Sequence, residues 1–198
     1  IPGLAEVRFH VLRTLDDALA LRDALPATRD AVVLGAGLIG MHAAENLAKA
    51  GARVTIVERE PHVLPGYFDA DAAAIIARTF AAEGVRLCAG ARAVRVESAG
   101  TAGTVTGGCK LVLDSGTALD CDLLVVGVGV APVTDFLAGS GVDLDRGVLV
   151  DDTMRSSVPN IWAAGDVAQA RGFYDGAKTL NGILPDAVEQ GRIAGMAM

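Results

Sequence analysis

The amino-acid sequence predicts an α/β fold, in which helices connect neighbouring strands of a parallel sheet. Three short apolar runs, at residues 31–34, 54–57 and 85–87, have the length of buried strands. Helical patterns at residues 38–50 and 71–82 separate these runs. Strands that alternate with helices over so short a stretch are typical of a parallel sheet.

A leading helix is predicted at residues 14–25, before the first strand. Thr14 can cap its first turn, and Asp16 and Asp17 suit the positive end of the helix dipole. Pro26 follows the last turn, where proline commonly marks a helix end.

The pattern changes over residues 91–120, where apolar residues alternate with polar ones. Residues 94–97 and 110–114 show this period of two, which is typical of antiparallel strands. The turns between them are marked by the glycines Gly100, Gly103, Gly107, Gly108 and Gly116. An antiparallel β-meander is therefore predicted as the crossover to the last core strand, at residues 123–126.

Beyond about Asp135 the parallel pattern is lost. Short strands are predicted at residues 148–150 and 161–163, and a helix begins near Pro185. The chain lacks an initiator Met, and its last helix reaches the final residue without a glycine exit. We therefore expect a piece of a longer protein, with a second domain that is incomplete.

Composition limits the classes of function. Of the 198 residues, 52% are hydrophobic and 4% aromatic, which indicates a globular fold packed from small side chains. A formal net charge of −7 argues against a nucleic-acid partner, because phosphate binding needs clustered Lys and Arg. No apolar run approaches the ~18 residues of a membrane-spanning helix, and none resembles a secretory signal.

The three cysteines, Cys88, Cys109 and Cys121, are widely spaced and form no Cys-x-x-Cys pair. Zinc sites and dithiol centres usually rest on such pairs. We expect three small buried side chains in a cytoplasmic protein, with no metal site. A catalytic thiol is the alternative, but no neighbouring residue in the sequence would activate one.

A glycine-rich turn after the first strand carries the strongest functional signal. The segment Gly35-Ala36-Gly37-Leu38-Ile39-Gly40 has the spacing of a dinucleotide-binding turn in a Rossmann-type fold. Gly35 allows the tight turn, Gly37 lets the backbone approach a pyrophosphate, and Gly40 lets the helix pack closely on the strand. The unpaired amides of the first helical turn, which includes Leu38 and Ile39, would face the pyrophosphate.

Glu58 ends the second strand, where an acid in this fold binds the adenosine ribose. A carboxylate there accepts hydrogen bonds from both ribose hydroxyls and repels a 2′-phosphate. We therefore predict NAD(H) in preference to NADP(H), although the adjacent Arg59 would partly offset that repulsion.

Gly127 and Gly129 follow the last core strand, on the side of the sheet where ligands bind in open α/β folds. Two interpretations stay open. The glycines form a flexible strand exit, or their bare backbone lines the nicotinamide end of the cofactor.

Three segments together resemble one family. Residues 35–58 and 123–132 are similar to the NAD(P)H domain of the pyridine nucleotide–disulfide oxidoreductases, which are flavoproteins with two dinucleotide sites. Residues 157–166, which read Ser-Val-Pro-Asn-Ile-Trp-Ala-Ala-Gly-Asp, resemble the second flavin-binding motif of that family and are the most specific of the three. Within the family the sequence is nearest to NADH-dependent rubredoxin and ferredoxin reductases and NADH oxidases.

The resemblance implies how the chain is divided. Residues 1–26 would form a linker and the leading helix, residues 27–134 the NAD(H)-binding domain, and residues 135–198 the C-terminal part of an FAD-binding domain. Gly165 would allow the flavin to approach closely, and Asp166 would bind the ribityl chain of FAD. The last helix would direct its N-terminal amides at the flavin.

The resemblance also implies missing parts. The family's first flavin-binding turn should precede Ile1, and its interface domain should follow Met198. We therefore expect FAD in the full-length protein, whereas this chain alone would hold it poorly and be inactive. His42 stands where many members have a glutamate near the nicotinamide, and it is either structural or a cofactor contact. Glu45, one turn further on, is expected to be a surface or interface carboxylate.

For the full-length protein the resemblance implies an oxidoreductase. Hydride would pass from NADH to FAD, and electrons would leave to an unidentified acceptor such as a redox protein. The residues identify no catalytic side chain, and an oligomer stays open. The competing interpretation is a non-catalytic, NAD(H)-responsive binding module. Asp166 and the last helix favour the flavoenzyme, because a nucleotide sensor needs neither.

Overall fold

The computed structural model describes residues 1–99 and 108–198, so the predicted turn glycines Gly100, Gly103 and Gly107 lie outside the described residues. The chain divides into two compact units, unit 1 (Ile1–Gly129) and unit 2 (Val130–Met198). Each unit has a buried apolar core of its own. The division falls a few residues before residue 134, where the sequence suggests a boundary.

Unit 1 is built on a parallel sheet in the order β3-β2-β1-β7. Its strands are β1 (Asp30–Leu34), β2 (Arg53–Glu58), β3 (Arg86–Ala89) and β7 (Leu123–Val126). Val32 of β1 lies opposite Thr55 of β2 and Leu124 of β7, and every neighbouring pair is parallel. The predicted parallel α/β fold is therefore confirmed.

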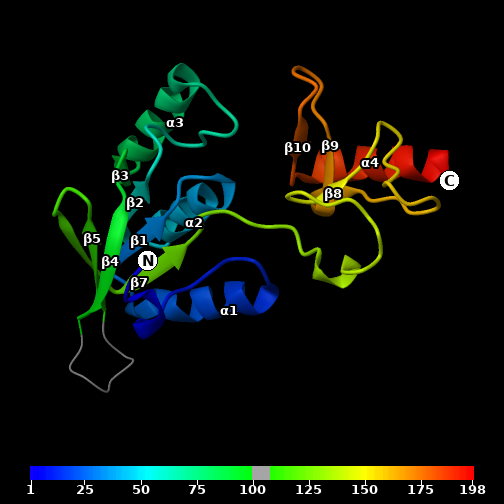
Figure 1. Cartoon of the computed structure of the whole chain (residues 1–198). Coiled ribbons are helices and arrows are strands. Elements are labelled where there is room, and N and C mark those ends of the chain that lie inside the picture. The colour runs from blue at the N-terminus through cyan, green and yellow to red at the C-terminus, as the bar shows by residue number, and fades with distance from the viewer. Residues whose placement is uncertain (100–107) are drawn as a thin grey trace. The chain divides into compact units, whose positions relative to one another are not determined.

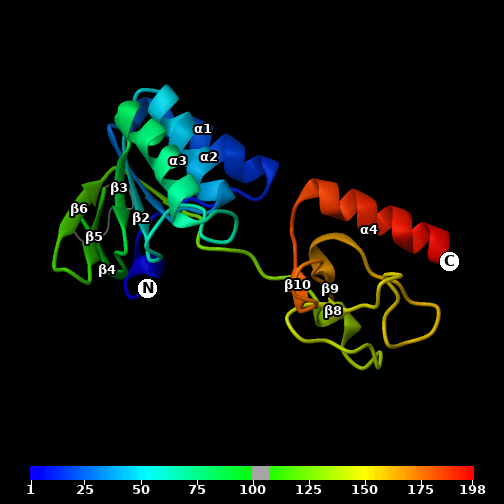
Figure 2. The same cartoon turned by 90° about the horizontal axis from the view of Figure 1, so that it is seen from above.

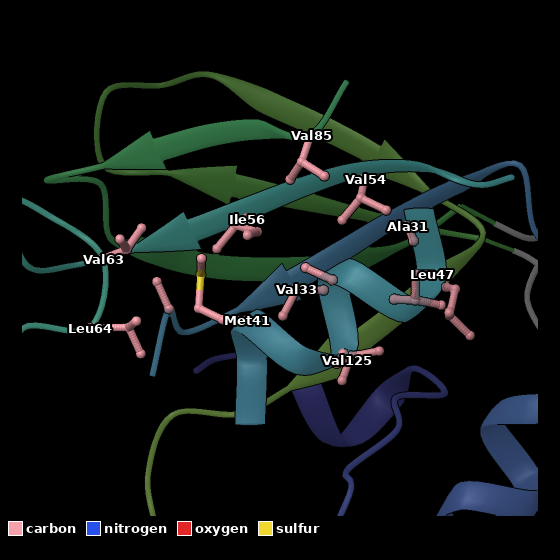
Figure 3. Close-up of a cluster of buried hydrophobic side chains, with 14 of the residues drawn as sticks. Ala31, Val33, Met41, Leu47, Val54, Ile56, Val63, Leu64, Val85 and Val125 are labelled. Atoms are coloured by element: carbon pink, nitrogen blue, oxygen red, sulfur yellow. The ribbon is translucent and has the colours of Figure 1, made fainter. Parts of the chain in front are cut away.

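Three helices cover one face of this sheet (Figure 2). They are α1 (Leu15–Ala24), α2 (Leu38–Lys49) and α3 (Ala70–Ala82). The predicted cap of α1 is present, since the Thr14 hydroxyl accepts from the Asp17 amide and the Asp17 carboxylate accepts from the Thr14 amide. Figure 3 shows the core under these helices, where Val33, Ile56 and Val125 of the strands meet Leu47 of α2.

An antiparallel sheet covers the opposite face (Figures 1 and 2). Its strands are β4 (Ala93–Ser98), β5 (Cys109–Leu113) and β6 (Ala118–Cys121), in that order. Side chains alternate along a strand, so Val32 and Leu124 point away from the helices and pack in one cluster with Leu111 of β5. The predicted meander is present, with β6 as a strand that the sequence pattern did not mark.

Unit 2 contains a small sheet in the order β10-β9-β8 and one long helix (Figure 1). These elements are β8 (Val148–Leu149), β9 (Ala168–Arg171), β10 (Lys178–Leu180) and α4 (Leu184–Ala197). Single turns of 3-10 helix lie at Leu4–Glu6, Leu25–Ala27, Asp135–Leu137 and Gly165–Val167. Among the described residues, no helix is both long and apolar enough to cross a membrane.

Two expectations for unit 2 were wrong. Residues 161–163 form no strand, because the chain turns at Asn160 (φ 65°) and again at Gly165 (φ 77°), which leaves one bridge between Trp162 and Arg155. Parallel pairing is also not lost, since β8 and β9 are parallel without an intervening α-helix.

Candidate functional site

The predicted glycine turn joins β1 to α2 with its backbone packed closely against neighbouring backbone. Gly35 has a φ of 97°, in the left-handed region that glycine adopts without strain. A Cβ built on Gly35 would lie 2.3 Å from the Gly127 carbonyl oxygen, and one built on Gly40 would lie 1.9 Å from the Gly35 carbonyl oxygen. Both positions are therefore closed to any larger residue.

Gly37 differs from Gly35 and Gly40 because a side chain at this position would point into open space. A Cβ there would meet nothing within 4 Å among the described atoms. Gly37 is also the N-cap residue of α2, and no side chain caps that end of the helix. The first amides of α2, which begins with Leu38 and Ile39, thus lie beside a space that a Cβ would partly fill. This arrangement fits the phosphates of a dinucleotide.

Glu58 lies beneath the same turn, at the end of β2. Its side chain is buried, with 9% of the residue exposed. One carboxylate oxygen accepts from the Ala36 amide at 2.6 Å, and the other accepts from the Glu60 amide at 2.8 Å. Each oxygen keeps a second lone pair, which suits a ribose hydroxyl. The carboxylate therefore also braces the glycine turn, a role that the sequence did not indicate.

Leu64 braces the turn from the other side and was missed by sequence reasoning. Its amide donates to the Ala36 carbonyl at 2.8 Å, so both polar groups of Ala36 are engaged. Leu64 has a φ of 50°, which is uncommon for a residue with a side chain. Figure 3 places its side chain among the buried residues near Val63 and Met41. No local sequence signal marks such a leucine.

Arg59 follows Glu58 in the chain, but its guanidinium pairs with Glu60. Its guanidinium lies 2.9 Å from a Glu60 carboxylate oxygen, and 70% of its side chain is exposed. The pair lies at the surface, so the cation is available to a ligand only in competition with Glu60.

The two glycines after β7 have different surroundings. The Gly127 amide donates to the Leu34 carbonyl at 2.8 Å, and a Cβ at Gly127 would lie 3.4 Å from the Gly40 amide nitrogen. Gly129 has a φ of 122° and, among the described atoms, nothing within 4 Å of a Cβ position. The structure thus brings Gly127 against the glycine turn, whereas Gly129 makes no such approach.

His42 and Glu45 lie on the exposed side of α2. The His42 Nδ1 atom is 3.9 Å from a Glu45 carboxylate oxygen, and Lys49 donates to that carboxylate at 2.6 Å. The hydrogen bond from Lys49 holds the pKa of Glu45 below its usual value. Beside them is a cavity of about 160 Å³, lined by Leu38, Met41, His42, Glu45, Leu64, Ile76 and Phe80. This volume is below the ~300 Å³ of small ligand pockets.

The predicted flavin residues lie in unit 2, around Gly165. The Gly165 amide donates to the Gln190 side chain of α4 at 2.8 Å. Asp166 is exposed, and its carboxylate accepts no hydrogen bond within the described part of the chain. A Cβ at Gly182 would lie 3.5 Å from that carboxylate. The buried Trp162 Nε1 atom likewise has no partner among the described residues. The free Asp166 carboxylate beside Gly182 fits a hydroxyl-rich ligand such as the ribityl chain of FAD.

The described residues contain no cluster of His, Cys, Asp and Glu that could hold a metal ion. The chemistry that this arrangement supports is dinucleotide binding through backbone amides and one buried acid. Unit 1 supplies Gly35, Gly37, Gly40, Glu58 and Gly127 for it.

Known proteins resemble the chain over most or all of its length. It is 54% identical over 198 residues to the NADH-dependent phenylglyoxylate dehydrogenase subunit epsilon of Aromatoleum evansii, which covers 100% of this chain and 45% of that protein. It is 34% identical over 182 residues to the rubredoxin-NAD(+) reductase of Pseudomonas putida, which covers 92% of this chain and 46% of that protein. The chain thus spans about half the length of these relatives.

Solved structures of related enzymes are similar to the chain over nearly its whole length. The water-forming NADH oxidase of Lactobacillus brevis, bound to NADH, superposes with a TM-score of 0.88 at 31% identity, over 99% of this chain and 42% of that one. An engineered variant of it, a water-forming NADPH oxidase bound to NADPH, gives 0.86 at 30% identity, over 99% and 42%. The sequence model of the pyridine nucleotide-disulphide oxidoreductases matches residues 1–191. The chain therefore belongs to the pyridine nucleotide-disulphide oxidoreductase family.

Proposed function

We propose that unit 1 binds NADH and that the longer protein is an FAD-dependent NADH oxidoreductase. The observation that carries this proposal is the open space at Gly37, at the uncapped start of α2, beside the buried carboxylate of Glu58. The chain covers about half of its relatives, so the activity of the whole protein is part of the proposal.

Each group has a separate task in this proposal. The first amides of α2 hold the pyrophosphate, and Gly37 keeps the backbone close to it. The Glu58 oxygens, each with one amide donor already, receive the ribose hydroxyls on their second lone pairs. In unit 2, Asp166 binds ribityl hydroxyls beside Gly182. FAD, when bound, supplies the acceptor for the hydride of NADH.

The engineered NADPH oxidase supports the preference for NADH. Its name records an aspartate exchanged for alanine and the next residue exchanged for arginine. The exchanged residues of that chain also include a glycine and a proline. Their distances in sequence from the aspartate equal those of Gly40 and Pro65 from Glu58, so the aspartate corresponds in position to Glu58. Here the acid is present and Arg59 already follows it. Loss of the acid alone should therefore move the preference towards NADPH.

The names of the relatives support a protein as electron partner. One is named a rubredoxin-NAD(+) reductase, and another is named a subunit of a dehydrogenase. We propose that electrons are exchanged with a redox protein or a partner subunit rather than with a small organic substrate.

Calorimetric titration of this chain with NADH and with NADPH tests the binding. We expect tighter binding of NADH, weakened about tenfold or more in Glu58→Ala, because hydrogen bonds to a charged group contribute ~1.5–3 kcal/mol. The ratio of NADPH affinity to NADH affinity should rise in the same variant. Glu83→Ala, which removes an exposed acid at the end of α3, is the control and should keep the preference for NADH. Tighter binding of NADPH by the unsubstituted chain, or no binding of either, would overturn the proposal.

The redox step is tested separately in the flavin-loaded, full-length protein. NADH added without oxygen should bleach the flavin absorbance. Persistent absorbance together with NADH binding would contradict the oxidoreductase and favour the binding module.

A further inference from the structure

Two cysteines meet in the antiparallel sheet of unit 1, away from the glycine turn. Cys109 is the first residue of β5 and Cys121 is the last of β6, and they are direct partners in the register of these strands. Their Sγ atoms lie 2.7 Å apart. Non-bonded carbon atoms pack at ~3.5–4.0 Å, so the two sulfur atoms, although larger, lie closer together than non-bonded atoms usually do.

The backbone at this pair suits a disulfide. Directly opposite residues of antiparallel strands have Cα atoms about 4.5 or 5.5 Å apart. Disulfides join residues whose Cα atoms are ~4.4–6.8 Å apart. A bond between Cys109 and Cys121 would therefore need no rearrangement of β5 and β6.

The surroundings restrict what could react with the pair. Cys109 is 5% exposed and Cys121 is 4% exposed, in the apolar cluster that also contains Leu111 and Leu124. No group of residues in the described chain could hold a metal ion here. Cys88 packs against the same cluster from β3 and is only partly buried. A reagent that reaches the pair must be small and uncharged.

The two sulfurs differ in their readiness to lose a proton. The hydrogen bond from the Cys121 thiol lowers the pKa of Cys109, in spite of the opposing effect of burial. The same hydrogen bond, reinforced by burial, raises the pKa of Cys121. Cys109 is therefore the sulfur that more readily forms the reactive thiolate, and Cys121 is placed to resolve its oxidised product.

We propose that Cys109 and Cys121 are a disulfide-forming site, oxidised reversibly by hydrogen peroxide. The Cys109 thiolate attacks one peroxide oxygen, the O–O bond breaks, and hydroxide leaves. Cys121 then attacks the Cys109 sulfur, the S–O bond breaks, and the oxygen leaves as water with the thiol proton. In total, two thiols lose two electrons and two protons, and the peroxide is reduced to two waters. A dithiol reductant reverses the reaction by exchange.

The bond would join two parts of unit 1. Cys121 precedes Asp122, whose carboxylate accepts from the Arg29 and Asp30 amides, at 3.0 Å each, where β1 begins. The disulfide would thus link β5 to the segment that anchors the antiparallel sheet at β1. Oxidation should raise the thermal midpoint of unit 1, because a cross-link restricts the unfolded chain.

Peptide mapping of the reduced chain after peroxide treatment tests this proposal directly. Trypsin places the three cysteines on three different peptides, because it cleaves after Arg86, Arg92, Arg95, Lys110 and Arg146. We expect the alkylatable thiols to fall from three to one. The peptides of Cys109 and Cys121 should be joined, with the loss of two hydrogen atoms, and dithiothreitol should separate them.

Substitutions provide the controls. Cys88→Ser should give the same linked peptides, whereas Cys109→Ser and Cys121→Ser should give none within one chain. A link that contains Cys88, or a link between two chains instead, would overturn the assignment. So would two sulfurs that stay alkylatable at peroxide concentrations that oxidise the urea-unfolded chain.

Discussion

The Glu58 carboxylate accepts a hydrogen bond from the Ala36 amide across 2.6 Å, so the acid that ends β2 holds the turn that ends β1. Parallel strands bring their carboxyl ends to the same edge of the sheet, which is why residues far apart in sequence meet there. A charged acceptor makes this a stronger bond than one between neutral groups. The stability of the turn and its proposed affinity for a dinucleotide therefore depend on the same side chain.

Glu58→Gln should destabilise unit 1. A glutamine has one carbonyl oxygen for two amide donors, so either the Ala36 or the Glu60 amide would face its NH₂ group. We expect a loss of about 1–3 kcal/mol in the free energy of unfolding, measured with urea. Glu60→Gln changes a more exposed acid and should stay within about 0.5 kcal/mol. Equal effects of the two substitutions would contradict the bracing role.

Gly37→Ala should weaken NADH binding with little loss of stability, whereas Gly40→Ala should destabilise the fold. The Gly37 backbone, with φ −75°, accepts alanine, and its Cβ meets open space, so the stability loss should be about 1 kcal/mol or less. NADH affinity should nevertheless fall in this variant. Gly40→Ala forces a Cβ against the Gly35 carbonyl, and unfolding should become easier by about 2 kcal/mol or more. Calorimetry and urea unfolding of both variants check this, and an unaltered NADH affinity in Gly37→Ala would oppose it.

His10 should make unit 1 sensitive to mild acid. Burial lowers the pKa of His10, the charge of Arg8 lowers it further, and Asp17 acts in the opposite direction. The unfolded chain therefore binds a proton at a pH where folded His10 is still neutral. The stability contribution is complete above the unfolded pKa of about 6.5 and is lost as the pH falls below it.

The measurement for His10 is the urea midpoint as a function of pH, from about 7.5 to 5. His10→Gln should flatten the decline below about pH 6.5. The exposed His42 provides the control, since His42→Gln should leave the decline unchanged. The same slope in all three proteins would show that other groups cause it.

Gly191→Ala should stabilise unit 2. Gly191 lies inside α4, where a Cβ would meet nothing within 4 Å of the described atoms. Alanine is favoured over glycine in a helix interior by roughly 0.5–1 kcal/mol, so the thermal midpoint should rise. Gly165→Ala should lower it, because Gly165 has a φ of 77°. A fall in both variants would indicate that α4 is not helical at Gly191.

The parts of the fold that depend on local signals could be predicted from the sequence. Thr14 and Pro26 bound α1, and the glycine turn marks the junction of β1 and α2. Strands β9 and β10 could not be predicted in this way. Their segments, Ala168–Arg171 and Lys178–Leu180, are short and partly charged, and they become strands only through their pairing. Their formation depends on unit 2 as a whole.

The same distinction holds for the sites. Gly37 and Glu58 were found because their spacing reflects a general binding geometry. The contacts of Leu64 with Ala36 and of Cys109 with Cys121 depend on a left-handed residue and on strand register. Neither feature produces a recognisable pattern in the local sequence. The sequence alone therefore suggests isolated cysteines, and their contact becomes evident only when β5 and β6 are paired.

The position of β7 determines when unit 1 can close during synthesis. β1 lies between β2 and β7, and His10 forms a bridge with Val125 of β7. Neither β1 nor His10 can complete its pairing until β7 leaves the ribosome, which happens after the whole meander. A nascent chain that ends at Asp120 has an unpaired edge on β1, and such edges recruit other chains. Shortening the gene to that point should give aggregates, whereas a chain ending at Gly129 contains every strand of the unit.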